Sequence, residues 1–137
     1  SLLTSSVYET EPVDCPEGSE PFYNAVIQVR CDLEPLEVLR KCQAIETRLG
    51  RPPERTRDHA PRTIDIDLLY YGGQEISEKE LELPHPRIME RRFVLDPLCE
   101  IRPGLILPGQ KKSIEEILSE WKGEEAGAIV FPENSWL

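Results

Sequence analysis

Apolar and acidic residues alternate strictly in the stretch Thr63–Leu69. This period of two is that of a β-strand and predicts a strand with one apolar and one acidic face. The apolar positions are Ile64, Ile66 and Leu68. On the other face, the Cα atoms of Asp65 and Asp67 would lie about 6–7 Å apart. Such a carboxylate pair suits Mg²⁺ with phosphate ligands, although a solvated strand face has the same pattern.

The N-terminal part of the chain predicts an antiparallel pair of strands. Leu2–Thr10 is rich in residues suited to a pleated surface. Ala25–Cys31 shows the alternating pattern of a second strand. Between them, Asp14–Pro21 contains the proline, glycine, serine and acidic residues of a loop, and Phe22–Asn24 leads into the second strand.

Two segments have helical spacing. The first is predicted to open at Glu34-Pro35 and to end at Gly50. Its apolar stripe comprises Val38, Leu39, Cys42, Ile45 and Leu49. The second begins with Ser113-Ile114-Glu115-Glu116, which has the form of a capping box. Its stripe comprises Ile114, Ile117, Leu118 and Trp121.

The remaining segments predict short elements. Tyr71-Gly72-Gly73 is expected to turn the chain, and the proline-rich Leu81–Pro86 to be extended. A helical turn is expected at Arg87–Arg92, followed by Phe93–Leu95 running toward Pro97, and a small edge strand at Leu105–Leu107. Within the unplaced tail 124–137, Ala128–Phe131 predicts a strand. Interleaved strands and helices with antiparallel pairing indicate a single α+β domain over residues 1–137.

Composition narrows the function. With 137 residues, 39% hydrophobic and 31% charged, the chain fits one soluble globular domain. Its formal net charge of −10 argues against nucleic-acid binding. No apolar run approaches membrane-spanning length, and no signal sequence is evident. The cysteines lack metal-ligand spacing and are interpreted as reduced thiols of a cytoplasmic protein: Cys15, Cys31, Cys42 and Cys99.

Neither a P-loop nor a kinase glycine loop is present, so phosphate binding would depend on metal ions and arginines. The pattern Asp58-x-Ala60-Pro61-Arg62-x-x-Asp65-Ile66-Asp67-Leu68-Leu69 resembles the signature of the 6-hydroxymethyl-7,8-dihydropterin pyrophosphokinases of folate biosynthesis. The resemblance extends from Ser5-Ser6-x-Tyr8-x-Thr10 to Ile117. It implies a ferredoxin-like sheet covered by helices, and transfer of pyrophosphate from ATP to the pterin hydroxymethyl group, with AMP as the other product.

The resemblance also implies roles for individual residues. Asp65 and Asp67 would bind two Mg²⁺ ions. The catalytic set is Arg51, Arg62, Asp65 and Asp67. The pterin would be held by Thr10, Phe22, Asn24 and Phe93. The nucleotide would be bound by Gln43, Glu46, Arg62, Leu68, His85 and Arg91. Dihydropteroate synthase and dihydroneopterin aldolase are the implied functional neighbours.

The chain departs from the family pattern at its start. Members normally begin with a strand, a Gly-Ser-Asn turn and a helix before the Ser-Ser-x-Tyr-x-Thr segment, where this sequence begins. An N-terminally incomplete domain lacking the first strand and helix is therefore expected. Two alternatives stay open: a catalytically silent pterin- or nucleotide-binding module, and a structural ferredoxin-like domain whose acidic pair is only a charged face.

Overall fold

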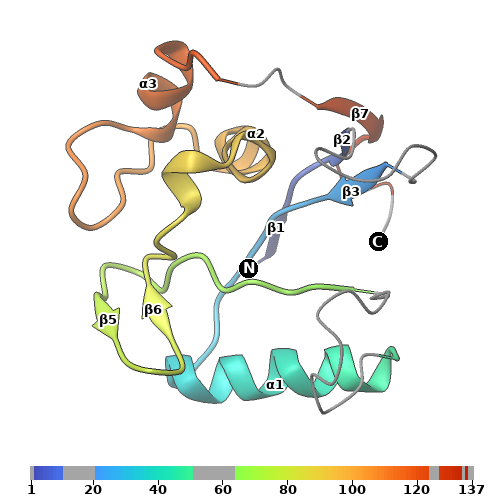
Figure 1. The fold of residues 1–137 in the computed structure, drawn as a ribbon, viewed down its shortest axis with the longest axis vertical. Coiled ribbons are helices and arrows are strands. Elements are labelled where there is room, and N and C mark those ends of the chain that lie inside the picture. Colours follow the sequence, from blue (N-terminus) through green and yellow to red (C-terminus); the bar gives the residue numbers. More distant parts are fainter. Residues whose placement is uncertain (1, 11–20, 51–63, 124–126, 134, 136–137) are drawn as a thin grey trace. The chain divides into compact units, whose positions relative to one another are not determined.

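A computed structural model describes residues 2–10, 21–50, 64–123, 127–133 and 135. The chain forms two compact units, each considered by itself. The first consists of Ser1–Arg30 and Pro86–Leu137, and the second of Cys31–His85. Helices and antiparallel strand pairs occur together, which confirms the α+β class (Figure 1).

An antiparallel ribbon forms the N-terminal part of the first unit, as predicted. Strand β1 (Leu2–Thr4) pairs with β4 (Ile27–Val29), and β2 (Val7–Thr10) pairs with β3 (Phe22–Asn24). The predicted second strand, Ala25–Cys31, was wrong in its bounds, because residues 22–24 belong to the ribbon and residues 25–26 interrupt it.

A buried serine explains the interruption. The Val26 N–H donates to the Ser5 hydroxyl oxygen at 2.9 Å, and the Ser5 N–H donates to the Val26 carbonyl at 2.9 Å. The Ser5 hydroxyl in turn donates to the Ser6 carbonyl at 2.7 Å. A side chain thus replaces one ladder carbonyl, which keeps the buried backbone groups satisfied without a regular strand.

Strand β7 (Ala128–Phe131) confirms the strand predicted in the tail. It pairs antiparallel with β2, with an irregularity between Val7 and Tyr8, and the strand order is β3-β2-β7 (Figure 1). The central strand of this sheet is therefore β2, which has a neighbour on each side.

The core of the first unit is built on α2 (Arg92–Ile101), which packs against β2, β3, α3 (Ile114–Ser119) and the 3₁₀ helix η1 (Ile88–Glu90). Its fully buried side chains are Ile88, Leu95, Pro97, Leu98 and Ile114. Helix α2 was not predicted, because Pro97 argues against a helix interior. Burial of its apolar face outweighs the hydrogen bond that proline cannot donate.

The predicted edge strand Leu105–Leu107 is wrong. The Leu105 N–H donates to the Arg102 carbonyl at 3.2 Å, and the Leu105 carbonyl accepts from the Ile114 N–H at 2.9 Å. These bonds belong to a turn and a loop closure, so they use the backbone groups that a strand partner would need. Leu107 is nevertheless buried and anchors the loop.

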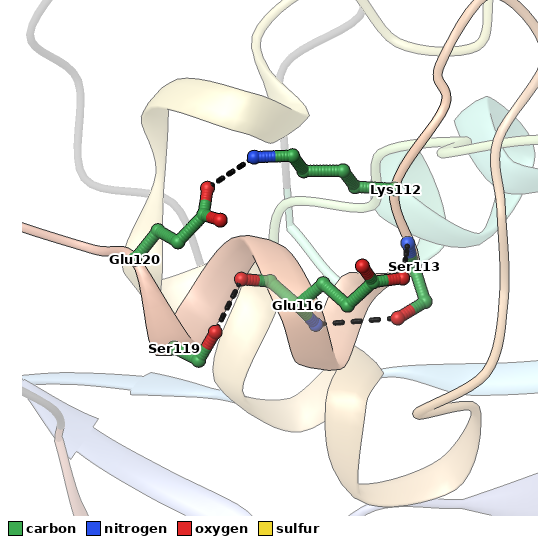
Figure 2. A network of polar contacts seen from close by, with 5 residues as sticks. All are labelled: Lys112, Ser113, Glu116, Ser119 and Glu120. Carbon is green, nitrogen blue, oxygen red and sulfur yellow. Dashed lines mark hydrogen bonds and ion pairs between the residues drawn. The ribbon is translucent and has the colours of Figure 1, made fainter.

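Helix α3 begins with the predicted capping box (Figure 2). The Glu116 N–H donates to the Ser113 hydroxyl oxygen at 3.2 Å, and the Ser113 N–H donates to Glu116 Oε1 at 3.1 Å. An ion pair between Lys112 and Glu120 spans the same helix. The two reciprocal bonds satisfy donors that every helix start leaves without an intrahelical partner.

We expect Ser113→Ala to lower the free energy of unfolding by about 1 kcal/mol, because the Glu116 N–H loses its acceptor. Urea unfolding measures the difference. Ser119→Ala is the matched control in the same helix, since that exposed hydroxyl donates to the Glu116 carbonyl at 2.7 Å and its loss should cost under about 0.5 kcal/mol. Equal losses for both variants would contradict the capping role.

The second unit contains α1 (Pro35–Arg48) and a small hairpin of β5 (Ile76–Ser77) and β6 (Glu82–Leu83). The Glu34 N–H donates to Glu37 Oε1 at 3.3 Å at the start of α1. Past its end, Gly50 has φ 109°, a value that favours glycine and confirms the predicted stop. Two positions of the predicted apolar stripe, Ile45 and Leu49, are 44% and 45% exposed.

Three of the cysteines lie in the described parts of the chain, and they are free thiols: Cys31, Cys42 and Cys99. Burial raises the pKa of Cys42 and Cys99, which keeps both in the protonated, less nucleophilic form at neutral pH. Among the described helices, none has the length and apolar character needed to cross a membrane.

Candidate active site

The acidic segment, residues 64–69, keeps its predicted alternation of apolar and acidic residues but is not a strand. Asp65 and Asp67 are exposed, whereas the apolar residues between and beside them are half-buried. Residues 64–70 lie in no ladder among the described parts of the chain, so the predicted strand Thr63–Leu69 is wrong over residues 64–69. Thr63 lies outside the described residues.

Other partners replace the strand ladder in this segment. The Ile66 N–H donates to Glu46 Oε2 at 2.8 Å, and the Leu69 carbonyl accepts from the His85 N–H at 2.7 Å. A strand is defined by repeated backbone pairing, and here a side chain and a backbone bond from the described residues help to hold the extended chain instead. One of these two bonds lies between the two aspartates.

Glu46 is one of two buried residues of α1, the other being Pro35, and 4% of its surface is exposed. The sequence predicts it as a nucleotide-binding residue, but its placement shows a role that the sequence did not suggest. Its carboxylate accepts from the backbone of Ile66, which separates the two aspartates. It therefore helps to set the direction in which the Asp65 and Asp67 side chains leave the chain.

We expect Glu46→Ala to increase the hydrogen-exchange rate of the Ile66 amide by about tenfold or more, because a hydrogen bond to a carboxylate is lost. Glu46→Gln is the matched variant, since its amide oxygen can still accept, and the rate should stay near that of the unaltered protein. Amide exchange followed by NMR measures both. An unchanged Ile66 rate in Glu46→Ala would show that the carboxylate does not hold this segment.

The donor chemistry of the acidic segment fits Mg²⁺. In the described parts of the chain, no group of three or more histidine, cysteine, aspartate or glutamate side chains could hold a metal ion. Magnesium does not require such a group, because it binds through one or two carboxylates and completes its octahedron with water and substrate phosphates. Asp65 and Asp67 are exposed at alternate positions and can supply that pair.

The other nucleotide-binding candidates of the second unit are spread over three elements. Gln43 is exposed on α1, Leu68 is half-buried in the acidic segment, and His85 is half-buried just after β6. His85 is held through its own N–H by the acidic segment. Arg51 and Arg62 lie outside the described residues.

Three of the predicted pterin-binding residues come together in the first unit. Thr10 in β2 lies opposite Phe22 in β3, and Asn24 lies two residues further along β3. The Asn24 side-chain amide donates to the Thr10 hydroxyl oxygen at 3.3 Å. Phe22 is 53% exposed, which is unusual for a phenylalanine and leaves apolar surface accessible to a ligand. An amide beside an exposed aromatic side chain can form hydrogen bonds with the edge of a flat heterocycle.

The fourth predicted residue, Phe93, lies in the first turn of α2 and is 36% exposed. The Arg91 guanidinium carbon stands 5.5 Å from the centre of the Phe93 ring, which is a cation–π distance. Helix α2 packs against β2 and β3. The first unit thus contains all four predicted pterin-binding residues and Arg91.

Comparison with known proteins identifies the family of the chain. The sequence model of the 7,8-dihydro-6-hydroxymethylpterin-pyrophosphokinase (HPPK) family matches residues 1–103. The chain belongs to this family. The match includes every site residue predicted above.

Several relatives in the family support the assignment. The chain is 43% identical over 97 residues to the 2-amino-4-hydroxy-6-hydroxymethyldihydropteridine pyrophosphokinase of Bacillus subtilis, covering 71% of this chain and 56% of the relative. The enzyme of the same name from Synechocystis is 34% identical over 139 residues, covering 95% and 69%. The folic acid synthesis protein fol1 of Pneumocystis carinii is 42% identical over 107 residues, covering 78% and 14%. The chain therefore spans about half of the Bacillus protein and a small part of the Pneumocystis protein.

Proposed function

We propose that this chain, as a single pyrophosphokinase domain over residues 1–137, transfers the pyrophosphoryl group of ATP to the hydroxymethyl oxygen of 6-hydroxymethyl-7,8-dihydropterin. The observation that carries the proposal is the family match over residues 1–103. In this reaction the hydroxymethyl oxygen forms a bond to the β-phosphorus of ATP, and the bond from that phosphorus to the α–β bridging oxygen breaks. AMP leaves, and the hydroxyl proton passes to solvent.

The pterin would bind in the first unit. The exposed side chains of Phe22 and Phe93 supply apolar surfaces for a flat heterocycle. They lie on β3 and α2, which pack together. Asn24, oriented by the Thr10 hydroxyl, offers both a donor and an acceptor to the amide-like edge of the ring. A pterin has such an edge, and simple aromatic ligands do not.

The phosphates would be bound by Asp65 and Asp67 with Mg²⁺, and by arginines. The ions would neutralise phosphate charge and lower the pKa of the attacking hydroxyl. The chain itself presents two exposed carboxylates on a segment in which the Ile66 N–H donates to the Glu46 carboxylate. Arg51 and Arg62 would stabilise negative charge that develops on the phosphates, and Gln43, Leu68, His85 and Arg91 would contact the nucleotide.

The finer expectations of the sequence belong to the same proposal. We propose a ferredoxin-like arrangement of the sheet, a cytoplasmic location, and substrates limited to ATP and the pterin. The family relative from Pneumocystis is named as a folic acid synthesis protein, and this chain covers 14% of it. That relation supports neighbouring activities in folic acid synthesis, and we propose dihydropteroate synthase and dihydroneopterin aldolase as these functional neighbours.

Release of AMP tests the proposal. The protein is incubated with ATP, Mg²⁺ and 6-hydroxymethyl-7,8-dihydropterin, and AMP and the pterin diphosphate are quantified by chromatography. We expect equal amounts of the two products and no AMP when the pterin is omitted. Release of ADP, or binding of both substrates without AMP, would overturn the assignment in favour of a different kinase or a silent binding module.

A further inference from the structure

Glu100 lies near the end of α2 and accepts three hydrogen bonds from the start of the central strand. The Ser6 N–H donates to Glu100 Oε1 at 2.9 Å, and the Ser6 hydroxyl donates to Oε2 at 2.7 Å. The Tyr8 hydroxyl donates to Oε1 at 2.8 Å. Ser6 and Tyr8 are both buried and Glu100 is half-buried, so this carboxylate joins the helix to the sheet at a partly buried contact.

The sheet side of this contact is the strand pair that holds the pterin-binding candidates. Tyr8 lies directly opposite Asn24 in the register of β2 and β3, and Thr10 lies opposite Phe22. Side chains of directly opposed residues share one face of a sheet. A change in the position of Tyr8 is therefore passed to Asn24 through the backbone ladder.

The helix side of the contact reaches Phe93. Seven positions separate Phe93 from Glu100 within α2, which is about two turns, so the two side chains leave the same side of the helix. Along the axis they are about 10 Å apart. A helix held at Glu100 cannot rotate or slide without moving the Phe93 ring relative to the strands.

The charge on Glu100 strengthens the contact. Burial alone would raise the pKa of this carboxyl, but the hydrogen bonds from Ser6 and Tyr8 outweigh burial and lower it. The pKa of Tyr8 is raised mainly by burial and, to a smaller extent, by the hydrogen bond to Glu100, so its hydroxyl stays a donor. All three bonds are therefore charge-assisted at neutral pH, the stronger kind of hydrogen bond.

We propose that Glu100 is a positioning residue for pterin recognition, which fixes the distance between the Phe93 ring on α2 and the Phe22 and Asn24 side chains on β3. It contacts no substrate itself. The proposal rests on the pterin-binding role given above and adds that the spacing between Phe93 on α2 and Phe22 and Asn24 on β3 is set from the C-terminal end of α2. It predicts that Glu100 controls affinity for the pterin and has no effect on affinity for the nucleotide.

The test compares Glu100→Gln and Tyr8→Phe with the unaltered protein. The glutamine keeps the shape but has one acceptor oxygen, and the phenylalanine removes one of the donors while keeping the ring. We expect 6-hydroxymethyl-dihydropterin to bind about tenfold more weakly to Glu100→Gln and about threefold more weakly to Tyr8→Phe. Binding of a non-hydrolysable ATP analogue with Mg²⁺ should be unchanged in both variants.

Ser113→Ala is the matched control, because it weakens the first unit at a helix cap without touching the Glu100 contact. It should lower the melting temperature and leave pterin affinity unchanged. Glu100→Gln with normal pterin affinity and only a lower melting temperature would overturn the proposal, as would an equal loss of nucleotide affinity. Tyr8→Phe decides the matter if Glu100→Gln does not fold. Failure of the unaltered protein to bind the pterin would count against the proposed function instead.

Discussion

Asp65→Asn and Asp67→Asn are each expected to lower kcat for AMP release by about a thousandfold or more, because each removes a carboxylate that would bind the catalytic metal. Asparagine keeps the volume and the hydrogen-bonding shape of aspartate but carries no charge. Both side chains are exposed. Their loss should therefore leave the melting temperature nearly unchanged.

Glu75→Gln is the matched control for the aspartate variants. It removes one charge from an exposed acidic residue of the same unit that has no proposed part in the reaction. Its kcat should stay within about twofold of the unaltered value. Titration with Mg²⁺ adds a second measurement, since the aspartate variants should require more metal for residual activity. Turnover within a few-fold of normal in both aspartate variants would remove the metal-binding assignment.

The alternation around Asp65 and Asp67 correctly predicted which side chains face solvent, although it failed to predict the secondary structure. Periodicity reports the faces of an extended chain, and an extended chain becomes a strand only when a neighbouring backbone pairs with it. Here Glu46 and the backbone of His85 provide the partners. Nothing local in the sequence marks a glutamate on a helix as the acceptor for an amide twenty positions away.

Local signals were sufficient where the interaction itself is local. The capping box at Ser113 and Glu116 and the stop at Gly50 depend on residues within one helical turn, and both predictions are confirmed. Helix α2 was missed because Pro97 brings a penalty that is visible in the local sequence. The burial that outweighs this penalty involves residues distant in sequence. The Glu100 contact spans more than ninety positions, so only the folded chain reveals it.

The pterin-binding candidates were found through the family motif, and the structure adds the reasons why those positions suit a ligand. Two phenylalanines in a small domain are expected in its core. Phe22 and Phe93 instead remain 53% and 36% exposed. Asn24 is oriented by Thr10 across the strand pair. Exposure and orientation depend on the packing of α2 on β2 and β3, which the residue pattern did not predict.

Phe93→Ala and Arg62→Ala are expected to have opposite effects on binding and turnover. Removing the Phe93 ring deletes an apolar surface for the pterin and should weaken pterin affinity by about tenfold to a hundredfold. Turnover at saturating pterin should change much less. Arg62→Ala should lower kcat by about a hundredfold through lost stabilisation of phosphate charge, with pterin affinity retained.

Two further measurements make this pair of variants decisive. Phe131→Ala is the matched control for Phe93→Ala, because Phe131 is 52% exposed in the same unit and has no proposed ligand. Since Arg91 stands over the Phe93 ring, nucleotide affinity must also be measured in Phe93→Ala to detect an indirect loss through that arginine. Equilibrium titrations give the affinities, and single-turnover experiments give the chemical rate. If Arg62→Ala weakened only pterin binding while the rate of chemistry stayed normal, the assignment of Arg62 to the phosphates would be wrong, because a phosphate contact acts on charge that develops during transfer.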